Sequence, residues 1–181
     1  APIIFAEEEQ RLKGATKFKT CTNRKWTECQ EKHSSPVQAE EAEAVSGWIY
    51  ENETYPELEG VLGGSYQPKN TNTLLSALPI LRKSGYKISD NDVRNGFRQV
   101  DQMTGLQGRW QKLRNSPTII CDTGHNVAGI SYIVEQLKQM KYERLHMVIG
   151  MVIDKDVSAV LALLPKNAVY YFTKASGKRA L

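Results

Sequence analysis

A strand-to-helix junction at residues 119–126 carries the side chains best suited to bind a ligand. The order is Ile-Ile-Cys-Asp-Thr-Gly-His-Asn, so an apolar strand ends at Asp122 and a helix begins at Asn126. In open parallel sheets ligands bind beyond the carboxyl ends of strands, where the Asp122 carboxylate can accept hydrogen bonds from a ribose. His125 lies beside a helix N-terminus, whose partial positive charge favours anions. The alternative is that Asp122 only caps the turn and His125 is simply exposed.

Arg109 is the cation best placed to meet a phosphate. It lies in the sequence Gly-Arg-Trp-Gln at residues 108–111, where Gly108 lets the backbone turn closely. The planar guanidinium matches the geometry of phosphate oxygens. The alternative is a surface arginine in a linker. Trp110 is predicted to pack against the protein rather than to stack on a base.

Residues 62–70, with the sequence Leu-Gly-Gly-Ser-Tyr-Gln-Pro-Lys-Asn, form a third candidate. Two adjacent glycines indicate a close approach of the backbone to another group. The amides of Gln67 and Asn70 can either read the edge of a base or cap the helix that follows. The segment is not a Walker phosphate-binding loop, because no Gly-Lys-Ser/Thr follows at the required spacing.

The elements before residue 106 are predicted to be short strands followed by helices. Strands are expected at residues 3–6, 16–26 and 48–50. The first helix ends at Gly85, and Pro79 is expected to kink or divide it. A second helix begins after an N-cap at Asp90 and stops at Gly105. Leucines at helical spacing define the apolar face of the first helix, namely Leu74, Leu75, Leu78 and Leu81.

After Pro117 the chain alternates between strands and helices. Strands are predicted at 118–121, 145–149 and 168–172, with helices at 126–140 and 157–164. This order favours an α/β fold with a mainly parallel sheet and right-handed crossovers. We therefore predict two domains, residues 1–106 and residues 107–181.

Composition narrows the functional classes. Of the 181 residues, 40% are hydrophobic and 24% charged, as in ordinary globular proteins. The net charge of +4 is spread along the chain, which argues against a nucleic-acid surface. Cys21, Cys29 and Cys121 fit neither a disulfide framework nor a zinc site, so we expect reduced thiols in a cytoplasmic protein. No apolar stretch approaches the roughly 20 residues of a membrane span.

Taken together and in this order, the segments resemble the Mur ligase superfamily, and within it the folylpolyglutamate and dihydrofolate synthases. The matching segments are residues 64–70, 108–111, 122–126, 149–156 and 171–176. The resemblance implies that residues 1–106 are the late part of an ATPase domain. It implies that residues 107–181 are an incomplete Rossmann-like glutamate ligase domain.

The resemblance also implies a reaction and roles for side chains. Such enzymes use ATP to phosphorylate a folate or dihydropteroate carboxylate, and the amine of L-glutamate then attacks the acyl phosphate. Asn70 would contact the adenine side of ATP with Gln67 next to it, Arg109 the phosphates, and Asp122 the ribose. His125 would position the glutamate and the nucleotide. We expect a monomer with ATP and Mg²⁺ as cofactors and small-molecule substrates, acting on neither nucleic acid nor membrane.

This sequence departs from the family pattern at both ends. It has no Gly-Lys-Ser/Thr loop, and the magnesium ligands and a modified lysine are expected upstream of Ala1, with none in this chain. We therefore expect a fragment that is inactive alone. The alternatives are a peptidoglycan-precursor Mur ligase and a noncatalytic α/β interaction module. The preferred interpretation requires Arg109 and Asp122 to face a common cleft.

Overall fold

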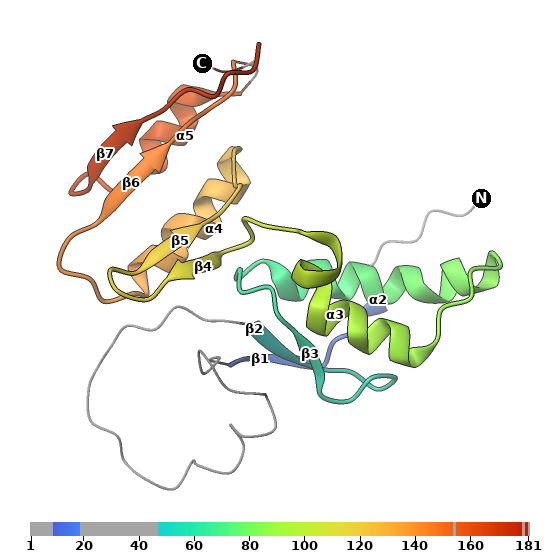
Figure 1. Ribbon diagram of the computed structural model, residues 1–181. Coiled ribbons are helices and arrows are strands. Elements are labelled where there is room, and N and C mark those ends of the chain that lie inside the picture. Colours follow the sequence, from blue (N-terminus) through green and yellow to red (C-terminus); the bar gives the residue numbers. More distant parts are fainter. Residues whose placement is uncertain (1–8, 19–46, 154, 179, 181) are drawn as a thin grey trace, which may run out of the picture. The chain divides into compact units, whose positions relative to one another are not determined.

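A computed structural model describes residues 9–18, 47–153, 155–178 and 180 (Figure 1). The chain divides into two compact units, one containing the described residues up to Cys121 and the other those from Asp122 onward. Each unit has its own hydrophobic core. The strand predicted at residues 3–6, Cys21 and Cys29 lie outside the described residues. No described helix combines the length and apolar character needed to cross a membrane.

The first unit contains an antiparallel sheet of β1 (Gly14–Phe18), β2 (Gly47–Glu51) and β3 (Leu58–Gly60), with β2 in the middle. The strand predicted at residues 48–50 is confirmed as β2. The register places Trp48 opposite Lys17 on one side and opposite Gly60 on the other. Side chains alternate between the faces of a strand, so Trp48 and Tyr50 share one face.

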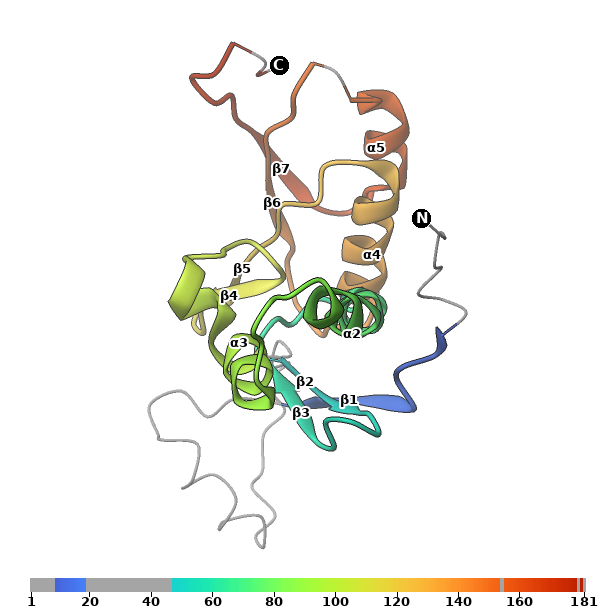
Figure 2. The ribbon, with the colours of Figure 1, turned by 90° about the vertical axis from the view of Figure 1, so that its right-hand side faces the viewer.

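Two helices, α2 (Gln67–Lys83) and α3 (Asp90–Thr104), lie on the same side of this sheet (Figure 2). The face of β2 that carries Trp48 and Tyr50 packs against these helices, in a core in which half of the buried residues are aromatic. The buried core residues are Trp48, Tyr50, Tyr55, Leu58, Leu75 and Val93.

The predicted leucine-rich helix is confirmed as α2, but Pro79 does not divide it. The helix runs without interruption from Gln67 to Lys83 with Pro79 inside it. Proline interrupts a helix because its ring lacks an N–H and clashes with the preceding turn. The helix nevertheless continues through Pro79, which is exposed.

The start of α3 was predicted one residue too late. The N-cap is Ser89, not Asp90, because the Ser89 hydroxyl accepts a hydrogen bond from the Asp92 backbone N–H at 3.1 Å. The Asp92 carboxylate accepts one from the Ser89 backbone N–H at 2.8 Å. This reciprocal pair is a capping box. The predicted stop at Gly105 is confirmed, with a φ of 67°.

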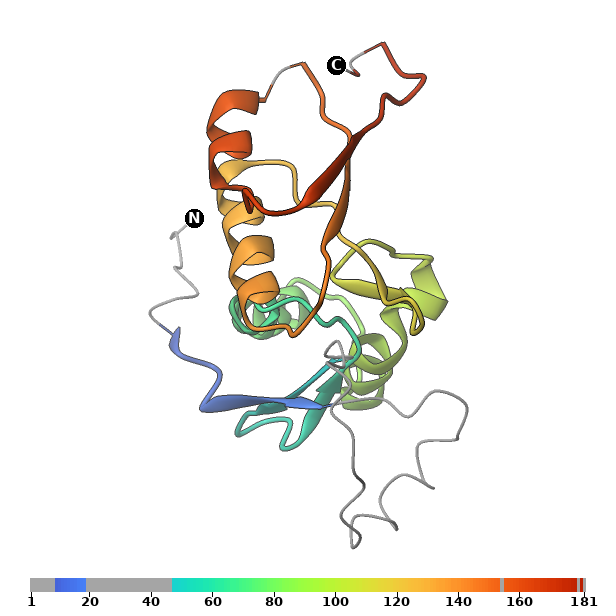
Figure 3. The same ribbon diagram turned by 90° about the vertical axis from the view of Figure 1, so that its left-hand side faces the viewer.

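The second unit follows the predicted alternation of helices and strands. Its elements are α4 (Val127–Lys138), β6 (His146–Ile149), α5 (Val157–Leu163) and β7 (Val169–Phe172). β6 and β7 pair in parallel, and both helices cover one face of this pair (Figure 3). The core of this unit consists of Ile130, Val160 and Leu164 with Met147, Ile149 and Tyr170 packed against them.

Two further strands, β4 (Gln111–Arg114) and β5 (Ile119–Cys121), form an antiparallel ladder. β5 was predicted and β4 was not, and parallel pairing among the described strands is limited to β6 and β7. The α/β class is confirmed. The domain division after residue 106 stays a prediction, and the compact units separate after Cys121 because β4 and β5 pair within the first unit.

The buried hydroxyl of Tyr50 predicts a pH-dependent stability. Tyr50 is 1% exposed, and burial raises its pKa to about 12, opposed by a hydrogen bond to Thr71. The unfolded chain releases this proton near pH 10 and the folded chain near pH 12. The contribution of the protonated Tyr50 hydroxyl to the free energy of unfolding is therefore complete below pH 10. It is lost as the pH rises from 10 to 12, by about 1.4 kcal/mol per pH unit at most.

We expect Tyr50→Phe to remove this alkaline loss and to lower the free energy of unfolding near neutral pH by about 1 kcal/mol. Urea unfolding followed by circular dichroism at several pH values measures both effects. Tyr86→Phe, which changes a tyrosine that is 63% exposed, serves as the control and should follow the wild type. Equal pH slopes for the wild type and Tyr50→Phe would contradict the prediction.

Candidate functional site

The loop that leads into α2 is fixed by the carbonyl of Gly64. This oxygen accepts a hydrogen bond from the Trp48 indole N–H at 3.1 Å and another from the Gln67 backbone N–H at 3.0 Å. A Cβ at residue 64 would lie 2.6 Å from the ring of Tyr66. The backbone at Gly64 is therefore closely approached by the Tyr66 ring, and an added Cβ would require that side chain to move.

Gln67 and Asn70 are brought together at the start of α2. Gln67 is the first helical residue and is 5% exposed, whereas Asn70 lies one turn later and is exposed. The Asn70 side-chain amide donates to the Gln67 side-chain oxygen at 3.4 Å. Neither caps the helix, because the N-cap position is Tyr66 and no side chain caps it. The structure thus removes the capping alternative for these two amides.

Arg109 is half-buried. The residues before and after it in the sequence both adopt left-handed backbone conformations. The φ angles are 70° for Gly108 and 54° for Trp110. A left-handed conformation costs a non-glycine residue roughly 1–2 kcal/mol, and such strain is concentrated at functional sites. Trp110 is 5% exposed, so the prediction that it packs is confirmed. The Gly108 N–H donates to the side-chain oxygen of Gln111 at 3.0 Å, which closes the turn around Arg109.

The β4–β5 ladder pairs two residues that lie close in sequence to Arg109 and Asp122. Gln111 is the partner of Cys121 in the ladder. Arg109 precedes Gln111 by two residues, and Asp122 follows Cys121 directly. Asp122 is therefore the first residue beyond the carboxyl end of β5, as predicted, but β5 pairs antiparallel with β4 and does not belong to the predicted parallel sheet.

Asp122 is half-buried and shapes the turn that joins β5 to α4. Its Oδ1 accepts a hydrogen bond from the Gly124 N–H at 2.7 Å. A Cβ at Gly124 would lie 2.7 Å from the Cδ1 of Ile133 and 3.4 Å from the backbone of Gly129. The turn thus lies directly against the first turns of α4, and the hydrogen bond from Gly124 orients the carboxylate.

His125 is exposed, and its Nδ1 lies 3.0 Å from the carbonyl oxygen of Thr123. A carbonyl can only accept, so this contact is a hydrogen bond in the tautomer that carries the hydrogen on Nδ1, and in that tautomer Nε2 presents a lone pair. Asn126 caps α4 as predicted, with its side-chain oxygen accepting from the Gly129 N–H at 2.8 Å.

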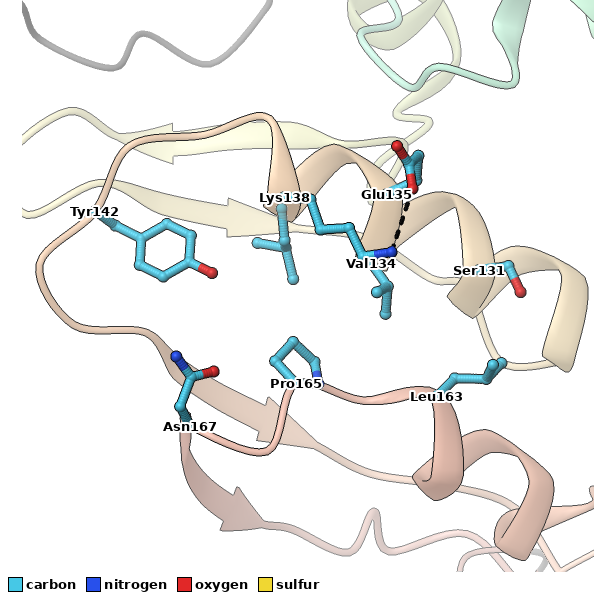
Figure 4. Close-up of a pocket in the computed structure, with 9 residues that line it drawn as sticks. Ser131, Val134, Glu135, Lys138, Tyr142, Leu163, Pro165 and Asn167 are labelled. Carbon is cyan, nitrogen blue, oxygen red and sulfur yellow. Dashed lines mark ion pairs between the residues drawn. The ribbon is translucent and has the colours of Figure 1, made fainter.

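A separate groove of about 490 Å³ lies in the second unit, between α4 and the segment that joins α5 to β7 (Figure 4). Apolar side chains line much of it, and an ion pair of 3.5 Å joins Glu135 to Lys138 at its rim. The residues that line it are Ser131, Val134, Glu135, Leu137, Lys138, Tyr142, Leu163, Pro165 and Asn167. These residues include none of the predicted site residues.

Among the described residues, no group of three or more His, Cys, Asp or Glu side chains could hold a metal ion. Sequence reasoning also missed Trp48, which it assigned only to a strand. The alternation of Trp48 and Tyr50 could have placed both on the inward face. Their partners in the loop and helix are tertiary contacts without a signal in the sequence.

Comparisons with known proteins agree on one family. The family described as "Mur ligase, glutamate ligase domain" matches residues 108–180. The dihydrofolate synthase/folylpolyglutamate synthase of Escherichia coli is 38% identical over 107 residues, which cover 58% of this chain and 24% of that protein. This chain therefore spans about a quarter of the length of that relative.

Two solved structures are also similar. A folylpolyglutamate synthase from Mycobacterium tuberculosis, complexed with ADP and AMPPCP, aligns with a TM-score of 0.58 and 28% identity over 76% of this chain and 31% of that one. A bifunctional folylpolyglutamate synthase/dihydrofolate synthase with Mn, AMPPNP and L-glutamate bound aligns with a TM-score of 0.51 and 26% identity over 75% of this chain and 32% of that one. The chain is therefore similar to the folylpolyglutamate and dihydrofolate synthases, and its residues 108–180 match the glutamate ligase domain of the Mur ligases.

Proposed function

We propose that this chain is part of an ATP-dependent ligase that joins L-glutamate to the carboxylate of a folate. The observation that carries the proposal is the extent of the similarity. The nucleotide-bound Mycobacterium tuberculosis enzyme aligns with 76% of this chain, so the likeness extends well beyond the glutamate ligase domain at residues 108–180. It therefore includes residues on both sides of the division after Cys121.

The adenine of ATP is bound, in this proposal, by the amide pair at the start of α2. A side-chain amide offers one acceptor oxygen and two N–H donors, which can match the donor and acceptor on one edge of adenine. Gln67 is buried and Asn70 exposed. Gln67 therefore orients the amide, and Asn70 makes the contact with the base.

In this proposal Arg109, two residues before β4, binds the phosphates, and Asp122, directly after β5, binds the ribose. The guanidinium of Arg109 donates to phosphate oxygens, and charge-assisted bonds of this kind are about twice as strong as neutral ones. The carboxylate of Asp122 accepts from the ribose hydroxyls. A carboxylate has about four acceptor positions, so its hydrogen bond to Gly124 is compatible with this role.

The reaction proceeds through an acyl phosphate. The γ-phosphoryl group of ATP moves to an oxygen of the folate carboxylate, which releases ADP. The amine nitrogen of glutamate then attacks the carbonyl carbon, phosphate leaves, and the nitrogen loses a proton to give the amide. The Nε2 lone pair of His125 is suited to accept a hydrogen bond from the amine of glutamate and so to position it.

The proposed cofactors are ATP and Mg²⁺. Bound AMPPNP and Mn in a related structure support a nucleotide and a divalent metal, and Mg²⁺ is the usual partner of ATP phosphates. Among the described residues no cluster of three or more His, Cys, Asp or Glu side chains could hold a metal ion. We further propose a cytoplasmic location on the grounds of cysteine usage, and a monomer that acts on small molecules on the grounds of the resemblance to the synthases.

The 181 residues alone are expected to be inactive with ATP, a folate and glutamate. Their sequence has no Gly-Lys-Ser/Thr loop to hold the triphosphate, and phosphoryl transfer depends on charge neutralisation and alignment. An ADP-release assay compares this chain with the product of its complete gene. Turnover by the 181 residues above background would contradict the prediction.

Arg109→Ala, made in the product of the complete gene, is expected to weaken binding of a non-hydrolysable ATP analogue roughly 10- to 100-fold, the range for a lost charged hydrogen bond. Isothermal titration calorimetry measures the change. Arg114→Ala is the matched control, because it removes the same charge from an exposed position in β4. Equal losses in the two variants would show only a general effect of charge.

His125→Ala, in the same protein, is expected to raise the KM for glutamate about 10-fold while leaving the KM for ATP within twofold, because a hydrogen bond to the glutamate amine is lost. Steady-state kinetics with each substrate in turn test this. His146→Ala, at an exposed histidine in β6, is the control. The proposed role is wrong if the KM for ATP rises as much as that for glutamate.

A further inference from the structure

We propose that Trp48 is a positioning residue for adenine recognition, acting through the backbone of Gly64 on the amides of Gln67 and Asn70. The inference rests on the proposed function of those amides. Trp48 lies in β2, 16 residues before Gly64. It would act on the nucleotide through the loop at the start of α2.

One carbonyl joins the strand to the helix. The Gly64 oxygen accepts from the Trp48 indole at 3.1 Å, and the Trp48 side chain is buried. The same oxygen accepts from the backbone N–H of Gln67 at 3.0 Å. The direction of the indole N–H therefore sets the position of the carbonyl from which α2 begins.

The indole is itself held from several sides. Trp48 is 7% exposed and is paired with Lys17 and Gly60 in the sheet. The Lys17 ammonium lies 5.4 Å from the ring centroid, within the range of a cation–π contact. The Tyr50 ring is stacked with it at 6.5 Å and 15°. A donor restrained in this way points in a defined direction.

Asn70 is connected to the loop at Gly64 by two hydrogen bonds. The Asn70 backbone N–H donates to the carbonyl of Tyr66 at 3.3 Å. The Asn70 side chain donates to the side-chain oxygen of Gln67 at 3.4 Å. Both partners lie within three residues of Gly64. A shift of the Gly64 carbonyl therefore turns the amide plane that faces the base.

The orientation of that amide decides which base is accepted. Adenine presents a donor at N6, where guanine presents an acceptor at O6. An amide fixed in one orientation accepts the first and rejects the second, because the wrong base leaves groups unpaired. Without the Trp48 N–H the loop is held less firmly, so the discrimination falls, whereas a simple loss of stability reduces the active fraction equally for both nucleotides.

The test measures kcat/KM for ATP and for GTP in the product of the complete gene. We expect Trp48→Phe to lower the ATP-to-GTP ratio about 3- to 10-fold, as for one neutral hydrogen bond. Val93→Ala is the matched control, because Val93 belongs to the same core and lies in α3, away from the loop. This control should leave the ratio unchanged even if total activity falls.

A second replacement guards against misfolding of Trp48→Phe. Incorporation of 3-benzothienylalanine at residue 48 keeps the bicyclic shape and replaces the N–H by sulfur. We expect the same lower ratio and faster hydrogen exchange at residues 64–70. A wild-type preference for ATP that persists unchanged in both replacements overturns the role of Trp48. A wild type without any preference for ATP instead overturns the proposed adenine site.

Discussion

The first unit depends on one carbonyl, that of Gly64, whose oxygen accepts two hydrogen bonds. Buried backbone groups and buried indole N–H groups both need hydrogen-bond partners, and the Gly64 oxygen satisfies Trp48 and Gln67 together. This interaction couples the register of β2, the conformation of the glycine pair and the start of α2. It also explains how a helix without a side-chain N-cap begins at a fixed residue, because the strand supplies the constraint that a cap would otherwise provide.

In the second unit, side chains of the turn between β5 and α4 fix the start of the helix. Asp122 accepts from the N–H of Gly124, and Asn126 accepts from that of Gly129. Building the turn and binding a ligand are therefore not competing explanations for Asp122. A carboxylate whose orientation is fixed by one backbone hydrogen bond is better prepared to accept another from a ribose, because less freedom is lost on binding.

The features predicted from sequence are those encoded by local signals. The cap at Asn126 and the stop at Gly105 each follow from a few neighbouring residues, and the parallel pair β6–β7 follows from the strand–helix–strand order. β3 and β4 were missed because Leu-Glu-Gly and Gln-Lys-Leu-Arg have little strand character, and pairing with β2 and β5 stabilises them instead. Ser and Asp are equally good caps, so only the reciprocal bonds of Asp92 identify Ser89. Likewise, no sequence signal relates Trp48 to Gly64.

The chemistry of the predicted site residues indicates what they can contribute to the proposed ligase. Gln67, Asn70 and Asp122 can recognise a base and a sugar through neutral amides and one carboxylate. Only Arg109 among the predicted nucleotide-binding residues carries a permanent positive charge, whereas the transferred phosphoryl group and its neighbours carry several negative charges that must be neutralised. A site with one cation and an acidic neighbour cannot supply that neutralisation. In the proposed ligase, the predicted site residues therefore fit recognition of the nucleotide, and neutralisation of the transferred phosphoryl group requires cations beyond this set.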